Sequence, residues 1–103
     1  MIEREVKESP LKQGADEQVA YSLTTTPWGT SPTSTSAKVF DITSTRTDVT
    51  TTVMPTGSTS VSGDIITLPI LKLLTAGNTY RLEVLFTCSG NVFEAYCIIQ
   101  AEL

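Results

Sequence analysis

The chain contains no histidine, only two cysteines and few charged residues. Without histidine, neither a Ser-His-Asp nor a Cys-His arrangement for nucleophilic catalysis is available, and two thiolates are too few to hold zinc. Charged residues make up 17 % of the 103 residues, with a formal net charge of −4. Because nucleic-acid binding depends on clustered Lys and Arg, nucleic acid is not an expected partner. These absences predict a protein that is not an enzyme.

Long apolar runs are also missing. The longest covers residues 65–74 and is interrupted by Thr67, Pro69 and Lys72, whereas a membrane-spanning helix needs about 20 predominantly apolar residues. The first residues lack the apolar core of a signal peptide. We therefore expect no membrane partner, and synthesis in a cytoplasm without a cleaved leader.

Hydroxyl side chains are abundant, with 18 threonines and 10 serines beside six glycines and five prolines. Thr favours strands, and Gly and Pro mark turns, so the composition predicts an all-β fold. The length predicts one domain. Residues 1–17 hold 8 of the 18 charged residues and are expected to form a flexible charged arm before a domain of residues 18–103. The alternative is an arm that becomes ordered on a neighbouring subunit.

Short alternating or apolar runs, separated by turn signals, predict a sandwich or barrel of about seven strands. The expected strands cover residues 18–24, 37–42, 48–54, 60–62, 65–68, 80–88 and 92–101. Gly63-Asp64 is expected to form the two-residue turn of a hairpin. Residues 71–74 are the one stretch compatible with a single helical turn.

The last two runs predict a hairpin with Gly90-Asn91 as its turn. In that register Val84 lies opposite Cys97, and Leu85 lies opposite Tyr96. One face of the hairpin is then entirely apolar and is expected to face the core. It comprises Leu82, Val84, Phe86, Cys88, Phe93, Ala95, Cys97, Ile99 and Ala101.

The two cysteines invite a disulfide, but the predicted register opposes it. Cys88 and Cys97 would lie about 13 Å apart along the hairpin, whereas a disulfide needs Cα atoms within about 7 Å. We expect both to be reduced and buried.

Calcium is the only plausible ion, because four aspartates are spread along the chain: Asp16, Asp41, Asp48 and Asp64. The spacing of a calcium-binding loop is absent, so turn formation is the favoured role of these residues. No cofactor, catalytic residue or small-molecule substrate is expected.

The stretch Leu74-Thr75-Ala76-Gly77-Asn78-Thr79-Tyr80 resembles the corner of fibronectin type III and other immunoglobulin-like domains. In such a corner the tyrosine hydroxyl bonds to the backbone upstream and fixes the crossover between the sheets. The resemblance assigns Leu74, Gly77 and Tyr80 to the corner. The alternative is an ordinary buried tyrosine, and Trp28 does not occupy the usual tryptophan position of these domains.

The whole chain is also similar to small immunoglobulin-like proteins encoded among the virion genes of tailed phages and prophages. A charged start leads through Lys12, Glu17 and Tyr21 to Trp28, and the middle reads Asp48-Val49-Thr50 and later Ser60-Val61-Ser62-Gly63-Asp64-Ile65-Ile66-Thr67. The corner, Gly90-Asn91 and a final strand ending in Glu102 complete the pattern. The resemblance implies a seven-stranded immunoglobulin-like β-sandwich, made in a bacterial cytoplasm and then built into a virion.

Some members of that group are adaptors between tail and fibre, which implies a non-enzymatic structural or adaptor role with virion proteins, or further copies of the chain, as partners. The alternative is a bacterial surface or carbohydrate-binding module, since such sandwiches are widely reused. Leu85, Tyr96 and Ile98 are the candidate interface, because an apolar group with a polar rim is typical of an interface core. Scattered surface hydrophobes are the alternative interpretation.

Overall fold

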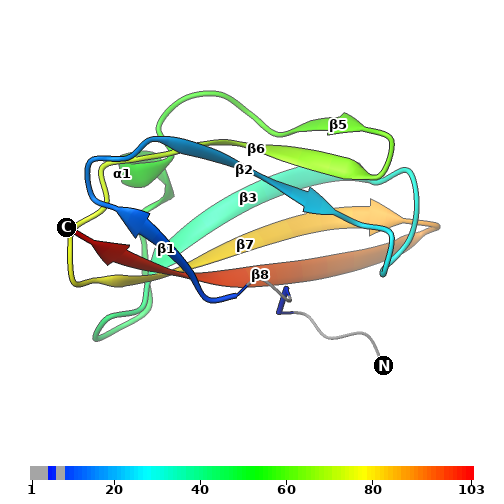
Figure 1. Ribbon diagram of the computed structural model, residues 1–103. Helices are drawn as coiled ribbons and strands as arrows, with labels where there is room; N and C mark the ends of the chain where they lie inside the picture. Colours follow the sequence, from blue (N-terminus) through cyan, green and yellow to red (C-terminus); the bar gives the residue numbers. More distant parts are fainter. Residues whose placement is uncertain (1–4, 7–8) are drawn as a thin grey trace.

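Two β-sheets cover each other's apolar faces in the computed structural model, which describes residues 5–6 and 9–103 (Figure 1). The strands are β1 (Leu11–Gly14), β2 (Val19–Thr24), β3 (Thr33–Asp41), β4 (Thr47–Asp48), β5 (Ser60–Ser62), β6 (Ile65–Leu71), β7 (Thr79–Cys88) and β8 (Asn91–Glu102), and one short helix, α1 (Thr50–Val53), follows β4. One sheet has the order β1-β8-β7-β3-β4 and the other the order β2-β6-β5. The expected all-β sandwich is confirmed, with eight strands in the described residues instead of seven.

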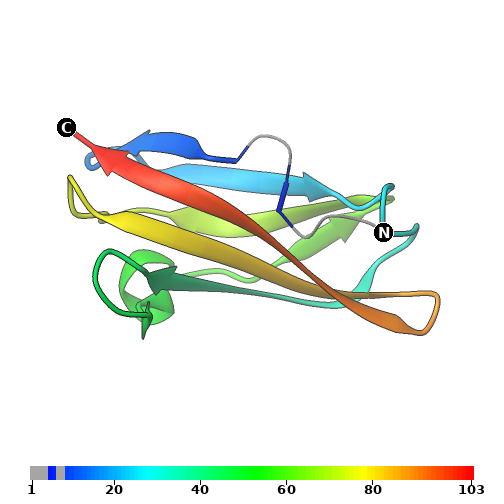
Figure 2. The same ribbon diagram turned by 90° about the horizontal axis from the view of Figure 1, so that it is seen from below.

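The first strand lies within the segment that the sequence assigns to a flexible arm. Leu11–Gly14 pairs in parallel with Ile99–Glu102, so β1 forms an edge of the larger sheet (Figure 2). Further upstream, the Val6 amide donates to the Tyr96 carbonyl at 3.0 Å. The expected boundary after residue 17 is therefore wrong for residues 11–14. The sequence pattern did not predict this strand, because charged residues lie around it and Gln13, its one fully buried side chain, is polar. Residues 1–4 and 7–8 of the expected arm lie outside the described residues.

The β7–β8 hairpin keeps the expected faces but has a different register. Ser89-Gly90 forms its turn, with φ of 51° and 80°, instead of Gly90-Asn91. Val84 therefore lies opposite Ala95, and not opposite Cys97. Because the pairing moves by two residues, every side chain stays on its predicted face.

The expected strand over residues 48–54 is wrong. Only Thr47–Asp48 pairs, as β4, and α1 follows at once. The Asp48 carboxylate accepts hydrogen bonds from the amide (3.0 Å) and hydroxyl (2.7 Å) of Thr50, which turns the chain. The turn brings Val53 and Met54 into the core, so tertiary burial overrides the alternating pattern.

The core lies between the sheets and consists mainly of the inward residues of β6, β7 and β8. Its largest fully buried apolar side chains are Phe86, Ile66, Leu71, Ile99 and Val39. Residues 72–74 form no helical turn after β6; Leu73 has φ of 61° and is 63 % exposed. The Gly63-Asp64 hairpin turn is as expected, with Ser62 paired to Ile65. No helix in the described part of the chain is long and apolar enough to cross a membrane.

Candidate functional site

The corner predicted at Leu74, Gly77 and Tyr80 has the expected hydrogen bond. The Tyr80 hydroxyl accepts from the Thr75 amide at 2.9 Å, and Tyr80 is 3 % exposed. Leu74 packs in the same core cluster, while Gly77 adopts φ of 90° and donates its amide to the Ala101 carbonyl at 2.9 Å. Gly77 therefore ties the entry into β7 to the end of β8, and Tyr80 ties it to the segment that follows β6.

The outer face of the larger sheet differs from the predicted apolar patch. Leu85 lies opposite Glu94, and Tyr96 lies opposite Glu83, so the expected Leu85–Tyr96 pair does not form. Ile98 lies opposite Arg81. The shifted hairpin register thus places Glu94 and Glu83 opposite Leu85 and Tyr96, whereas Tyr96 and Ile98 stay neighbours on one face of β8.

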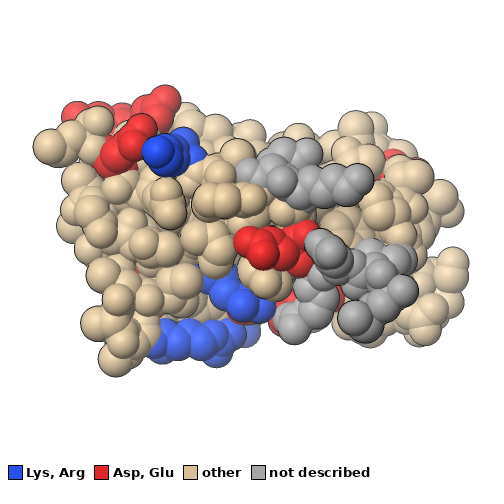
Figure 3. Space-filling view, turned by 60° about the horizontal axis from the view of Figure 1, so that its bottom comes forward, with Lys and Arg blue, Asp and Glu red and all other residues tan. Residues whose placement is uncertain are grey.

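Those charges form a connected network. Glu83, which is buried, accepts from Arg81 at 2.7 Å and from Arg46 at 3.2 Å. Arg81 also lies 3.9 Å from Glu94, and its guanidinium carbon stacks 3.8 Å from the centre of the Tyr96 ring. Acidic and basic side chains accordingly lie next to one another on the face in Figure 3. A role of Leu85, Tyr96 and Ile98 in partner binding stays a prediction.

Three of the four aspartates, Asp41, Asp48 and Asp64, serve turns and loop contacts. The Asp41 carboxylate accepts from the hydroxyl (2.7 Å) and amide (3.0 Å) of Thr43, as Asp48 does from Thr50. These hydrogen bonds hold the pKa of both carboxyls below the ordinary value of 3.8. Asp64 accepts from the Thr26 hydroxyl and the Ser31 amide. Within residues 5–6 and 9–103, no three His, Cys, Asp or Glu side chains come together as a metal site would require.

Both cysteines are buried and neither forms a disulfide, as the sequence predicts. Cys88 lies opposite Asn91 and Cys97 opposite Leu82, well apart on the hairpin. A Cβ atom at Gly29 would lie 2.7 Å from the Cβ atom of Cys88, so only glycine allows this close approach of the loop to β7.

An apolar groove of about 830 Å³ is the feature that sequence reasoning missed. One wall is formed by residues 20–24 of β2 and the other by residues 95–97 of β8. Other lining residues are Glu5, Val6, Leu11, Pro27, Trp28, Leu68, Leu82 and Val84. Among the described residues in this lining, Glu5 is the one with a charged side chain. The strand order, which no local pattern reveals, creates this groove.

Gln13 joins the two sheets next to Tyr21, which lines the groove. Its amide nitrogen donates to the carbonyls of Leu71 (2.8 Å) and Glu17 (3.2 Å), and its amide oxygen accepts from the Tyr21 hydroxyl (2.8 Å). Every hydrogen-bond donor of this side-chain amide is used, although Gln13 is only 1 % exposed. Burial, with smaller contributions from Cys97 and Glu17, raises the pKa of Tyr21, so its hydroxyl stays a donor to Gln13 at neutral pH.

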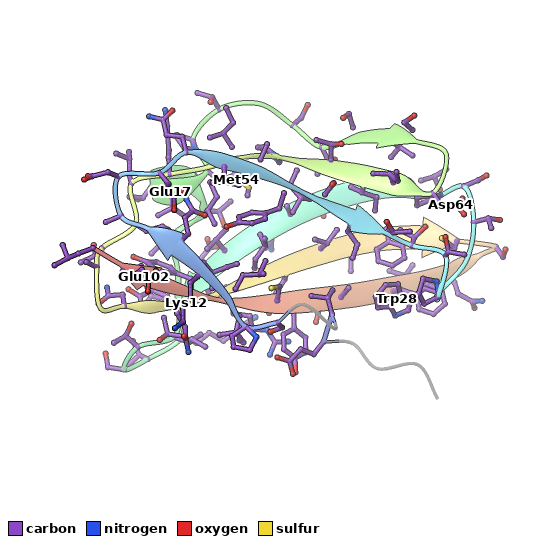
Figure 4. All side chains as sticks on the ribbon, viewed as in Figure 1. Lys12, Glu17, Trp28, Met54, Asp64 and Glu102 are labelled. Atoms are coloured by element: carbon purple, nitrogen blue, oxygen red, sulfur yellow. The ribbon has the colours of Figure 1, made fainter. Side chains whose placement is uncertain are left out.

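Trp28 lines the groove at the opposite end of the molecule from Glu17 and Glu102 (Figure 4). Its ring meets the Phe86 ring edge to face, with centroids 5.8 Å apart. This contact places the side chain at the margin of the core, half-buried.

The wall formed by β2 is the edge of its sheet. The Thr25 amide donates to the Asp64 carbonyl at 2.8 Å. Because residues of an antiparallel pair alternate between hydrogen-bonded and non-hydrogen-bonded positions, Leu23 also bonds to β6. Ser22 and Thr24 therefore direct their N–H and C=O groups away from β6, toward the open side.

Compared with known proteins, the chain matches no protein-family model, and no curated protein or solved structure is significantly similar to it.

Proposed function

We propose that the chain is a non-enzymatic structural or adaptor protein of a phage or prophage virion, in the tail or head–tail region, and that it acts through protein–protein contacts. The sequence resemblance to virion immunoglobulin-like proteins is the basis for assigning the chain to a virion. Such a protein would be made in a bacterial cytoplasm and then incorporated into the particle.

The strand order supports an immunoglobulin-like assignment. Counting β2 to β8 as strands B, C, C′, D, E, F and G, the order β8-β7-β3-β4 corresponds to G-F-C-C′, and β2-β6-β5 corresponds to B-E-D. This is the order of immunoglobulin-like sandwiches. The bond from Thr75 to Tyr80 corresponds to their tyrosine corner.

The observation that carries the contact role is the edge of β2. An edge strand offers unpaired backbone groups to another chain, and proteins that avoid such pairing protect the edge with charges or proline. The residues of β2 include neither a charged side chain nor proline, and β2 borders an apolar groove. The one irregularity in its described pairing lies between Ala20 and Ser22. An edge without charge or proline supports a role in assembly.

Purified particles from the organism that encodes the chain provide the test. Quantitative mass spectrometry should find the chain in a fixed ratio to the tail proteins, and antibody labelling should place it at the tail or the head–tail junction. Its absence from intact particles would contradict the proposal.

A bacterial surface or carbohydrate-binding module is the second candidate. It is favoured by the aromatic residues Tyr21, Trp28 and Tyr96 in the groove lining. A glycan array separates the two: saturable binding of a sugar, together with absence from particles, would establish this candidate in place of the first.

A further inference from the structure

The groove lies along the edge of β2, so it borders the backbone of this strand as well as its side chains. Successive side chains of a strand point to opposite faces of the sheet, yet all five residues from Ala20 to Thr24 line the groove. An occupant would therefore meet the strand's backbone as well as inward side chains such as Leu23.

Within the described residues, the outward backbone groups of Ser22 and Thr24 have no hydrogen-bond partner. The N–H and C=O groups of Ser22 and Thr24 point away from β6, as the bond from Thr25 to Asp64 requires. In the described part of the chain, no hydrogen bond reaches them from outside the β2–β6 ladder. Both residues are exposed. An extended peptide is the occupant whose backbone can pair with such groups.

The remaining lining defines the side chains of that peptide. Leu68, Leu82, Val84 and Ala95 provide an apolar floor between the sheets, which suits apolar side chains at alternate positions of an extended segment. Six residues of β2 span about 20 Å. Its pairing with β6 shifts register between Ala20 and Ser22, so the regular part of the edge begins at Ser22. Glu5, the one charged residue among the described residues that line the groove, favours a basic residue in the segment.

A second copy of the chain fits this site less well. Pairing β2 with its own symmetry mate would bring two Glu5 carboxylates and two chains of net charge −4 toward each other. Of the other edge strands in the described structure, β1 has four residues, β4 has two and β5 has three. None of them matches the six residues of β2.

We propose that the edge of β2 and the adjoining groove bind one extended segment of a partner protein, with apolar side chains at alternate positions and a Lys or Arg opposite Glu5. The segment adds a strand beside β2 and fills the groove with every second side chain. This site locates the protein–protein contact of the proposed function and rests on that function.

A displayed library of random linear ten-residue peptides, selected on the folded full-length chain, provides the probe. Enriched peptides should share apolar residues at every second position and at least one Lys or Arg. Binding of a tryptophan-free peptide should change the fluorescence of Trp28, which is the single tryptophan, in a saturable way. It should also slow amide hydrogen exchange at Ser22 and Thr24.

Two variants and their controls assign the binding to this edge. Ser22→Pro removes an outward amide without removing a bond to β6, and should weaken peptide binding at least tenfold. Ser22→Ala keeps the amide and should bind within twofold of the unchanged chain. Glu5→Gln keeps the acceptor for the Ser9 hydroxyl but removes the charge, and should weaken binding of the basic peptides several-fold.

Three results would overturn the docking proposal: no enriched alternating peptide, undiminished binding to folded Ser22→Pro, or self-association of the chain that protects the same amides. If Ser22→Pro fails to fold, amide exchange in the unchanged chain decides, because unprotected Ser22 and Thr24 in the complex would also overturn it. If the chain is found in virions but the peptide experiments fail, only the docking site at β2 is contradicted. If the chain binds such peptides but is absent from virions, only the virion role is contradicted.

Discussion

Gln13 illustrates how a single polar side chain can join two sheets. It comes from β1 at the edge of the larger sheet and bonds to the carbonyl of Leu71 in the smaller one. A buried amide with all its bonds made adds specificity, because any displacement leaves polar groups unpaired. The same side chain fixes the Tyr21 hydroxyl at one end of the groove.

Replacing Gln13 should therefore be costly. Gln13→Leu keeps the approximate volume but leaves the Tyr21 hydroxyl and the Leu71 carbonyl without partners, so the free energy of unfolding should fall by about 2 to 3 kcal/mol. Urea denaturation measures this. Gln100→Leu, at an exposed position of β8, is the matched control and should change stability by less than about 0.5 kcal/mol. Equal effects of the two substitutions would show that Gln13 does not join the sheets.

The corner hydroxyl has a measurable contribution of its own. Tyr80→Phe retains the buried ring and removes only the acceptor for the Thr75 amide. The free energy of unfolding should fall by about 1 to 2 kcal/mol. A change indistinguishable from zero would mean that Tyr80 contributes by packing alone.

The two turn aspartates predict an acid-sensitive component of stability. Hydrogen bonds from Thr43 and Thr50 lower the folded-state pKa values of Asp41 and Asp48 below 3.8. A lowered folded-state pKa stabilises the fold above the unfolded-state pKa, and this contribution is lost as the pH falls through the folded-state value. The free energy of unfolding, from urea titrations between about pH 6 and pH 2, should fall less steeply in a variant that combines Asp41→Asn with Asp48→Asn. An unchanged pH dependence would contradict the assignment.

At the scale of elements, the β7–β8 hairpin depends on its turn. Ser89 and Gly90 both have positive φ, which a two-residue turn of this kind requires. An ordinary residue in this conformation loses about 1 to 2 kcal/mol, whereas asparagine tolerates it better. Asn-Gly is the preferred pair in such turns, and the sequence supplies Ser-Gly.

Ser89→Asn should therefore stabilise the chain by about 0.5 kcal/mol, a fraction of the left-handed penalty. Thermal unfolding followed by circular dichroism measures it as a higher Tm. Ser44→Asn, in an exposed loop without positive φ, is the control and should leave Tm unchanged. Destabilisation by Ser89→Asn would indicate that the turn is not at Ser89-Gly90.

How well the sequence predicts a feature of this fold depends on the range of the interactions that determine the feature. Alternation predicted the faces of β2, β7 and β8 because burial repeats every second residue. It did not predict the hairpin register, since moving the turn by one residue preserves both faces. It also failed at α1, where hydrogen bonds from Thr50 to Asp48 and burial of Val53 override the alternation.

The candidate site was less predictable than the fold. The corner at Tyr80 is contained in a short motif and could be recognised. The groove depends on which strands lie at the sheet edges, and the pairing of β1 with β8 spans nearly the whole chain. The available signal was the absence of charge and proline from Val19–Thr24, but this has meaning only once the strand is known to be an edge.

At the scale of the whole molecule, the position of β1 determines which sheet edge stays unpaired. By pairing with β8, β1 extends the larger sheet and leaves β2 at the edge of the smaller one. On this side Gln13 connects the two sheets, and the groove borders the edge of β2. This asymmetry provides one long, uncharged edge for another chain.

Amide hydrogen exchange in the isolated chain, resolved residue by residue by NMR, tests the open edge of β2 most directly. Amides bonded within a sheet exchange slowly, and unpaired amides exchange rapidly. The account predicts alternation along β2 and into the turn, with rapid exchange at Ser22 and Thr24 and slow exchange at Leu23 and Thr25. Uniformly slow exchange across these four residues would mean that β2 is already paired on both sides, and would contradict the account.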